Sequence, residues 1–304
     1  MTTRTVSAIA HAKVILLGEH AVVYGYPALA VPVTAMTLTA TVDIFQPDGG
    51  RSILSTDRYH GPLNQAPKEY DGLAFLASLM SPSPIKLSYH SSIPQGRGLG
   101  SSAASAWATV QALNQAKNLG WPVEQLVQAG NRAEDIVHGN ASGVDLAAVR
   151  SNRLVVYRRT KGFTAVDNHL GAWLVIADTG QPGSTKKAVA SVHHQIETSE
   201  PKKADMDRLG ALATEGIDAW RRKDIARLGA LFNQAQDILA EFGLSTLKID
   251  RLIRLAHRAG AQGVKLSGSG LGGVIIALAE NQEQAKSVSH ALGAVASGVW
   301  IQEM

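Results

Sequence analysis

A glycine-rich stretch that runs directly into a helical pattern is the feature that most constrains this chain. Residues 93–105 read IPQGRGLGSSAAS, with Gly96, Gly98 and Gly100 at alternate positions, and a helical pattern covers residues 103–118. Glycine permits positive φ and lets a ligand approach main-chain N–H groups. A helix that begins after such a loop presents unpaired N–H donors and partial positive charge. The stretch therefore predicts an anion site suited to a nucleotide phosphate.

The same stretch has a simpler interpretation, which is a glycine-rich turn with a serine at the helix N-cap. It differs from a Walker A loop because no Lys-Ser/Thr pair follows the last glycine. Its spacing also differs from that of a dinucleotide-binding loop. Ser101 and Ser102 can cap the helix or bind Mg²⁺, which needs as little as one hydroxyl and one carboxylate from the protein.

A carboxylate lies on the apolar face of the helix predicted over residues 122–138. Glu134 belongs to the same stripe as Leu126, Val127 and Ala133. A buried carboxylate must be paired, neutral or bound to a cation. A salt bridge, for instance to Arg132, and a metal site are both open.

Asp145 follows that helix, after a turn of small residues over 139–143 that lets a ligand come close to the backbone. An aspartate at this position can orient or deprotonate a hydroxyl. Alternatively, it caps the helix at Ala147 or Ala148.

Two further motifs lie near the ends of the chain. Residues 10–25 read AHAKVILLGEHAVVYG, and Lys13, Glu19 and His20 bracket a strand predicted over Val14–Leu17. This indicates either a polar site or ordinary polarity at strand ends. Residues 265–274, KLSGSGLGGV, predict strand, glycine loop and strand, which by itself is also typical of a tight hairpin.

The 304 residues, 45% of them hydrophobic, are enough for two domains with real cores. Both halves mix helices and strands, so the predicted class is α+β, with a boundary near 165 that gives domains 1–165 and 166–304. Helices are predicted over 186–198, 205–222, 224–241, 246–260 and 282–292, and strands over 153–158, 172–177 and 296–302.

Composition excludes several classes of function. The net charge is only +4, with 25 acidic residues and no long basic run, which argues against nucleic-acid binding. The absence of cysteine excludes disulfides, thiolate catalysis and cysteine-ligated zinc. Residues 21–42 carry no charge, but glycine and prolines interrupt them and their second half alternates, so we expect a strand and no membrane span. A cytoplasmic protein is predicted.

Three motifs in one order are far more specific than any of them alone. Lys13–Gly25, Pro94–Ala104 and Lys265–Gly273 resemble the motifs of the galactokinase, homoserine kinase, mevalonate kinase and phosphomevalonate kinase superfamily. Within it, GEHAVVYG together with Asn131–Asp145 is similar to the mevalonate kinases, and the compact length to their bacterial members. The resemblance implies a two-domain kinase fold, with a left-handed βαβ crossover in the N-terminal domain and a ferredoxin-like C-terminal domain.

The resemblance also implies a reaction, the phosphorylation by ATP of the 5-hydroxyl of mevalonate in isoprenoid biosynthesis, in a cytoplasmic homodimer. Asp145 would take the proton of the hydroxyl, Lys13 would lower the pKa of that hydroxyl, and Ser102 and Glu134 would bind Mg²⁺. ATP would contact Pro94, Gly96, Arg97, Gly98, Leu99, Gly100, Ser101 and Ser102. Mevalonate would contact Lys13, Glu19, His20, Asp145, Ser267, Gly268, Ser269 and Gly270.

The sequence departs from many relatives at His11-Ala12, Ala141 and Leu271, and none of these changes removes a reactive group. Two alternatives stay open. One is another kinase of the superfamily, acting on phosphomevalonate or homoserine. The other is a sensor that binds ATP and a small molecule without turnover, although a sensor has no need of the set Lys13, Ser102, Glu134 and Asp145.

Overall fold

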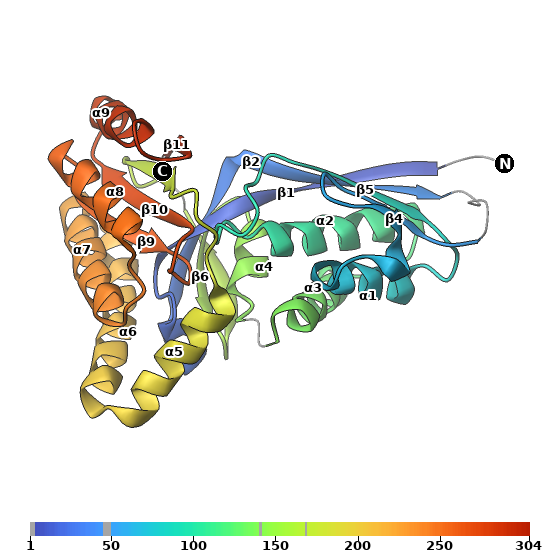
Figure 1. The fold of residues 1–304 in the computed structure, drawn as a ribbon, viewed down its shortest axis with the longest axis horizontal. Helices are drawn as coiled ribbons and strands as arrows, with labels where there is room; N and C mark the ends of the chain where they lie inside the picture. Colours follow the sequence, from blue (N-terminus) through green and yellow to red (C-terminus); the bar gives the residue numbers. More distant parts are fainter. Residues whose placement is uncertain (1–3, 45–49, 140–141, 168) are drawn as a thin grey trace. The chain divides into compact units, whose positions relative to one another are not determined.

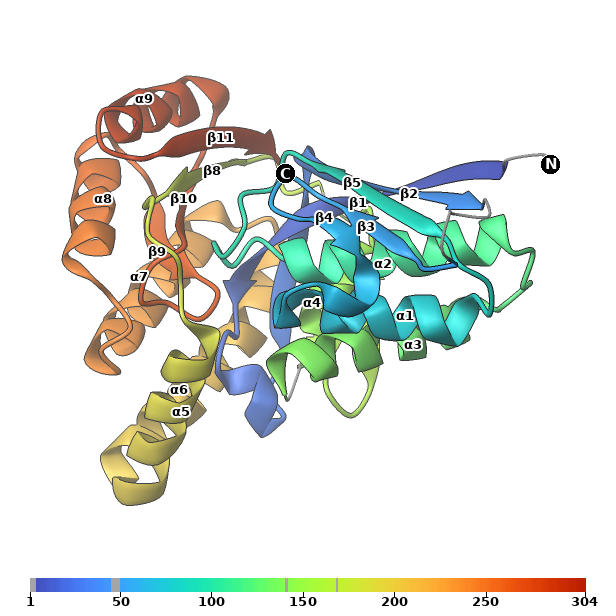
Figure 2. The same cartoon turned by 45° about the vertical axis from the view of Figure 1, so that its right-hand side comes forward.

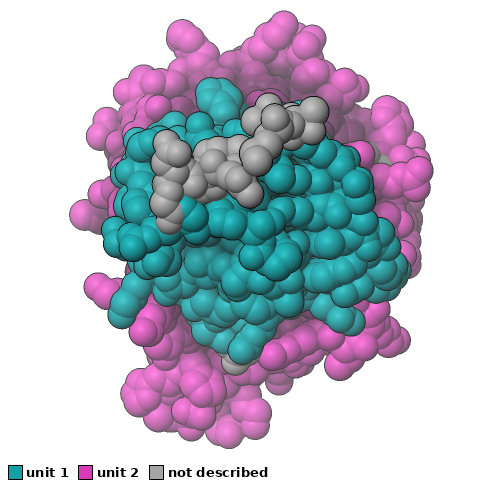
Figure 3. All heavy atoms as spheres, turned by 90° about the vertical axis from the view of Figure 1, so that its right-hand side faces the viewer, with its two compact units in different colours: residues 1–12, 36–94, 100–150 teal, residues 13–35, 95–99, 151–304 magenta. Residues whose placement is uncertain are grey.

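The computed structural model of the protein describes residues 4–44, 50–139, 142–167 and 169–304 (Figure 1). The chain divides into two compact units (Figure 3). Unit 1 comprises residues 1–12, 36–94 and 100–150, and unit 2 comprises residues 13–35, 95–99 and 151–304. Strands β1 (Arg4–Leu17) and β2 (Ala28–Ile44) pass from one unit into the other. The domain boundary near residue 165 stays a prediction, because the compact units are discontinuous in the sequence.

The sheet of unit 1 uses the second half of β2. Leu38–Asp43 pair antiparallel with β5 (Lys86–Ser91), and β5 pairs in parallel with β3 (Ile53–Ser55). β3 in turn pairs antiparallel with β4 (His60–Pro62). Leu38, Ala40 and Val42 are buried and the residues between them are partly exposed. The alternation therefore gives the predicted strand with one wet face.

Helices pack together in unit 1: α1 (Asp71–Met80), α2 (Ser101–Ala116), α3 (Val123–His138) and α4 (Val144–Val149). α1 was not predicted from the sequence. Two short 3₁₀ helices, Leu63–Gln65 and Lys68–Tyr70, precede it. A Cβ at Gly72 of α1 would lie 2.6 Å from the carbonyl oxygen of Ala133 in α3. Glycine at position 72 therefore allows the backbones of the two helices to approach closely.

Unit 2 contains a four-stranded antiparallel sheet in the order β11–β8–β10–β9 (Figure 2). Its strands are β8 (Trp173–Asp178), β9 (Gly263–Ser267), β10 (Val274–Ala279) and β11 (Gly298–Glu303). Every residue of β9 and β10 is buried. In a separate pairing, the first residues of β2 lie beside β6 (Leu154–Arg158), and β6 pairs with β7 (Gly162–Val166).

Helices cover the four-stranded sheet. α7 (Ile225–Glu241), α8 (Leu247–Arg258) and α9 (Gln282–Gly293) contact its strands, and α6 (Glu200–Arg221) packs against α7 and α5 (Thr185–Thr198). All the helices predicted for this half of the chain are present, with ends that differ by a few residues. The predicted α+β class is confirmed. No helix in the described residues is long and apolar enough to cross a membrane.

Candidate functional site

The first and third sequence motifs meet residues 95–99 of the second motif inside unit 2. The main-chain N–H of Lys13, in β1, donates to the carbonyl oxygen of Leu99 at 3.0 Å. The Ser267 hydroxyl, at the end of β9, accepts from the N–H of Ile15 at 2.9 Å and donates to the carbonyl of Ile15 at 3.0 Å. These contacts join segments that are far apart in the sequence. The hydroxyl of Ser267 is thereby engaged with the main chain of β1.

The glycine-rich loop, residues 95–99 in this unit, packs against the third motif. Gly98 has φ +74°, and a Cβ there would lie 3.4 Å from the carbonyl oxygen of Ser267. A Cβ at Gly273, with φ +78°, would lie 2.7 Å from the carbonyl oxygen of Arg97. Side chains at these two positions would meet both a strained backbone and a neighbouring main chain.

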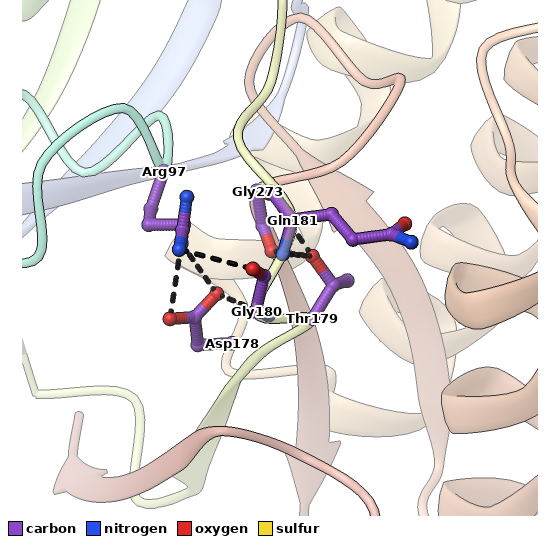
Figure 4. Close-up of polar contacts among 6 residues, drawn as sticks. All are labelled: Arg97, Asp178, Thr179, Gly180, Gln181 and Gly273. Carbon is purple, nitrogen blue, oxygen red and sulfur yellow. Dashed lines mark hydrogen bonds and ion pairs between the residues drawn. The ribbon is translucent and has the colours of Figure 1, made fainter.

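The Arg97 side chain connects this loop to the end of β8 through an ion pair and hydrogen bonds (Figure 4). Its Nε lies 3.0 Å from Oδ1 of Asp178, and it donates to Oδ2 at 3.1 Å. One terminal nitrogen of Arg97 donates to the carbonyl of Gly180 at 3.1 Å. Nearby, the Thr179 hydroxyl donates to the carbonyl of Gly273 at 2.7 Å. The Arg97 side chain thus joins the glycine-rich loop to protein groups at the end of β8.

Three ionisable side chains of the first and third motifs are buried together. Lys13, Glu19 and Lys265 have exposed fractions of 1%, 2% and 0%. The Lys265 ammonium donates to Oε1 of Glu19 and, at 2.6 Å, to the carbonyl of Leu266. A charge pair this deep in the protein is costly to desolvate, so its hydrogen bonds must compensate.

Burial and charge act in opposite directions on these groups. Burial raises the pKa of Glu19, while the charge and hydrogen bond of Lys265 and the charge of Lys13 oppose that rise. Burial lowers the pKa of Lys265, and Glu19 opposes the change. Burial also lowers the pKa of His20 to about 4, with a smaller opposing effect from its hydrogen bond to Ser269. His20 is therefore neutral at physiological pH.

Several contacts hold the glycine loop of the third motif, residues 268–273. His20 Nε2 donates to the carbonyl oxygen of Ser269 at 3.1 Å, and the Ser269 hydroxyl lies 3.2 Å from that of Thr185. Leu271 adopts φ +61°, and its N–H donates to the carbonyl of Leu244 at 2.8 Å. A non-glycine residue therefore holds a left-handed position in the loop. Gly268 and Gly270 also have positive φ. The loop joins β9 to β10, as the predicted order of strand, glycine loop and strand requires, but residues 268–273 are longer than a tight turn.

In unit 1, the predicted metal-binding pair is brought together. Glu134 of α3 is 5% exposed, and the Ser102 hydroxyl of α2 donates to its Oε1 at 2.5 Å. His138, one turn further along α3, has Nε2 at 4.0 Å from Oε2 of Glu134. Burial lowers the pKa of His138, and the charge of Asp145 opposes this. A hydroxyl and a carboxylate that converge in this way are hard oxygen donors, which suits Mg²⁺.

Several of the remaining predicted site residues lie at the N-terminal ends of helices in unit 1. The N-cap of α2 is Gly100, with φ +77°, so Ser101 and Ser102 lie in the first turn. The serine N-cap considered as the simpler alternative is therefore wrong.

Asp145 is half-buried in the first turn of α4, whose N-cap is Gly143. Pro94 precedes the glycine loop as the last residue of its segment of unit 1. Ala141, where the chain departs from many relatives, is outside the described residues.

Two residues of this region were not singled out from the sequence, Lys265 and Asp178. Each is a charged residue on a buried strand, where an unpaired charge is costly. A charged residue in an otherwise apolar strand is a signal that the sequence contains, in GVKLS of β9 and in WLVIAD of β8. The partners, Glu19 and Arg97, are 246 and 81 residues away in the sequence.

Comparison with known proteins identifies the family. Residues 68–152 match the family described as GHMP kinases N terminal domain, and residues 205–298 match GHMP kinases C terminal. A mevalonate kinase of Pyrococcus furiosus is 31% identical over 92% of this chain and 90% of that protein. The chain belongs to the GHMP kinase family.

Further proteins are similar to this chain over comparable lengths. A mevalonate kinase of Aeropyrum pernix is 33% identical over 92% of this chain and 90% of that protein. The crystal structure of L. major mevalonate kinase in complex with R-mevalonate matches with a TM-score of 0.84 and 25% identity, covering 99% of this chain and 97% of that chain. A Lactococcus lactis galactokinase, 17% identical with a TM-score of 0.80 over 99% of this chain and 94% of that one, shares the fold.

Proposed function

We propose that this GHMP kinase is a mevalonate kinase, which transfers the γ-phosphoryl group of ATP to the 5-hydroxyl of mevalonate. Its curated relatives named mevalonate kinase match nearly the whole chain, at 31–33% identity. The observation that carries the proposal is the pairing of Ser102 with the buried Glu134. These two oxygen donors suit the Mg²⁺ that accompanies ATP in phosphoryl transfer, a reaction that depends on positioning and on neutralising charge. A sensor without turnover has no need of the full set Lys13, Ser102, Glu134 and Asp145.

Ser102 and Glu134 are proposed to hold Mg²⁺, with water completing its coordination. The bound ion supplies positive charge that neutralises the phosphate oxygens. The main-chain N–H groups at the start of α2, after Gly100, carry partial positive charge and therefore also suit a phosphate. The main-chain groups of residues 96–99 are proposed to contact the remainder of the triphosphate.

Asp145 is proposed as the general base. It takes the proton of the 5-hydroxyl as that oxygen forms its bond to phosphorus and the bond from phosphorus to the ADP oxygen breaks. Lys13 is proposed to lower the pKa of the hydroxyl through its positive charge. Glu19, His20 and residues 267–270 are proposed to contact mevalonate.

A parallel assay tests the proposal. Release of ADP from Mg-ATP is measured with mevalonate, phosphomevalonate, homoserine and galactose as acceptors. Turnover with mevalonate alone is expected. Turnover only with another acceptor would keep the kinase and overturn the substrate. ATP binding without turnover of any acceptor would replace the enzyme with a sensor.

A homodimer in the cytoplasm is proposed from the same family resemblance. Light scattering of the purified protein should give twice the mass of one chain, and the mass of one chain would overturn the dimer.

A further inference from the structure

Lys265 and Glu19 form an ion pair inside unit 2 that lies outside the groups assigned to phosphoryl transfer. Their side chains are 0% and 2% exposed. The Lys265 ammonium donates to Oε1 of Glu19 and to the carbonyl oxygen of Leu266. Two of its three donors are therefore directed by fixed acceptors. The ammonium in turn holds the Glu19 carboxylate in one orientation.

The second oxygen of this carboxylate is left open. Oε2 of Glu19 is buried, and no described residue makes a hydrogen bond to it. Buried polar atoms are nearly always hydrogen-bonded, so an exception needs an explanation. An ion pair with a purely structural role would be expected to satisfy both oxygens. An open acceptor beside residues of the first motif is what a ligand with a hydroxyl donor requires.

The groups that face this carboxylate determine its charge. Lys265 from β9 and Lys13 from β1 favour the ionised form, whereas burial opposes it. His20, the next residue, directs Nε2 toward the carbonyl oxygen of Ser269 and carries no charge at neutral pH. Lys265 contributes the largest of the effects that keep Glu19 ionised. Without that lysine, the carboxylate would face the full effect of burial.

We propose that Lys265 is a positioning residue for substrate binding: it fixes Glu19 as a carboxylate whose Oε2 accepts a hydrogen bond from a hydroxyl of the bound alcohol. This inference rests on the proposed function, in which mevalonate supplies the hydroxyl. Lys265 itself does not touch the substrate and acts through Glu19.

Lys265→Met tests the inference, because methionine keeps the length of the side chain without its charge. At neutral pH the buried Glu19 of this variant takes up a proton and no longer offers a charged acceptor. The KM for mevalonate should rise about 10- to 100-fold, the loss expected for one hydrogen bond to a charged group, with a smaller change in kcat. As the pH increases, Glu19 ionises again and the KM should return toward the wild-type value.

Two further variants keep the test decisive if Lys265→Met does not fold. The double variant Glu19→Gln/Lys265→Met contains neither charge, and replacing a buried ion pair by neutral groups is often tolerated. Its KM should stay high at every pH, because glutamine cannot ionise. Lys265→Arg keeps the positive charge and should keep a KM near that of the wild type. Lys248→Met is the matched control, since Lys248 also donates to a main-chain carbonyl in unit 2 but, within the part of the chain that the structure describes, pairs with no carboxylate.

The outcomes separate this inference from the proposed function. Absence of wild-type turnover with mevalonate would overturn the proposed function, and the inference with it. An active wild type, with a Lys265→Met variant whose KM follows that of Lys248→Met at every pH, would overturn the inference alone. A double variant with a wild-type KM would do the same.

Discussion

Nε of Arg97 lies 3.0 Å from Oδ1 and 3.1 Å from Oδ2 of Asp178, which joins the glycine-rich loop to the end of strand β8. The arginine is 20% exposed and the aspartate 8%, so the pair is largely shielded from water. A charged hydrogen bond in such a place is stronger than a surface ion pair. The loop is therefore held in its shape before any ligand binds.

Loss of this pair should weaken ATP binding more than it slows the reaction. In Arg97→Met the loop must be ordered by the nucleotide, and that cost reduces affinity. We expect the KM for ATP to rise about 10-fold, equivalent to roughly 1.4 kcal/mol, with little change in kcat. Steady-state kinetics with ATP varied at saturating mevalonate measure both. Arg221→Met removes an exposed arginine of the same unit and serves as control; equal KM values in the two variants would contradict the role of the pair.

Asp145→Asn removes the proposed base and keeps the size of the side chain. We expect kcat to fall about 10²- to 10⁴-fold, the usual contribution of a general base, while the KM for ATP changes little. Rapid-quench or coupled assays of ADP release measure the loss. Asp57→Asn, an exposed aspartate in unit 1, is the control. Turnover close to wild type in Asp145→Asn would remove this residue from the role of base.

Glu134→Gln should change the magnesium requirement. An amide binds the ion more weakly than a carboxylate. The Mg²⁺ concentration that gives half-maximal activity should therefore rise at least about 10-fold, which corresponds to roughly 1.4 kcal/mol of lost binding free energy. Ser102→Ala should act in the same direction, because the hydroxyl donates to Glu134. Magnesium titrations at constant total ATP give the comparison. Glu124→Gln, on the exposed first turn of the same helix, should titrate like the wild type. Unchanged titrations in both site variants would favour a structural pair.

Local patterns were sufficient to predict much of the fold and part of the site. The placement of Glu134 among apolar residues at helical spacing predicted its burial, and the structure confirms it. Val123 has the same helical spacing in the sequence, but it is 46% exposed because it begins the helix. Periodicity describes the middle of a helix better than its first turn.

Other features depend on contacts that no local pattern contains. Strand β1 was predicted over Val14–Leu17 but begins at Arg4. Its buried positions before Lys13 are alanines, whereas the larger apolar Ile9 is 58% exposed, so the sequence shows no clear apolar and polar alternation there. Helix α1 has only 10 residues, which is too short for a clear helical period of apolar residues, and it follows a polar segment. The Lys265–Glu19 pair joins residues 246 positions apart, so its partner is fixed only by the folded sheet.

His20 should make the stability of the protein depend on acid. Its pKa in the folded protein is about 4, below the ordinary value of 6.5, chiefly because it is buried. Between pH of about 4 and 6.5, the folded state thus binds fewer protons than the unfolded state. The contribution of His20 to stability is complete above the ordinary value and is lost as the pH falls from there toward 4. Between pH of about 7.5 and about 5, the free energy of unfolding should decrease by roughly 2 kcal/mol from this residue.

Chemical unfolding of the wild type and of His20→Gln at both pH values isolates that contribution. Glutamine can still donate to the carbonyl of Ser269 but cannot take up a proton. Glu19 and Lys265 are present in both proteins, so their own titration largely cancels in the difference. The wild type should therefore lose more stability than the variant on acidification, whereas His194→Gln, which changes an exposed histidine of α5, should behave like the wild type. Parallel acid dependence in the wild type and His20→Gln would show that burial does not hold His20 neutral.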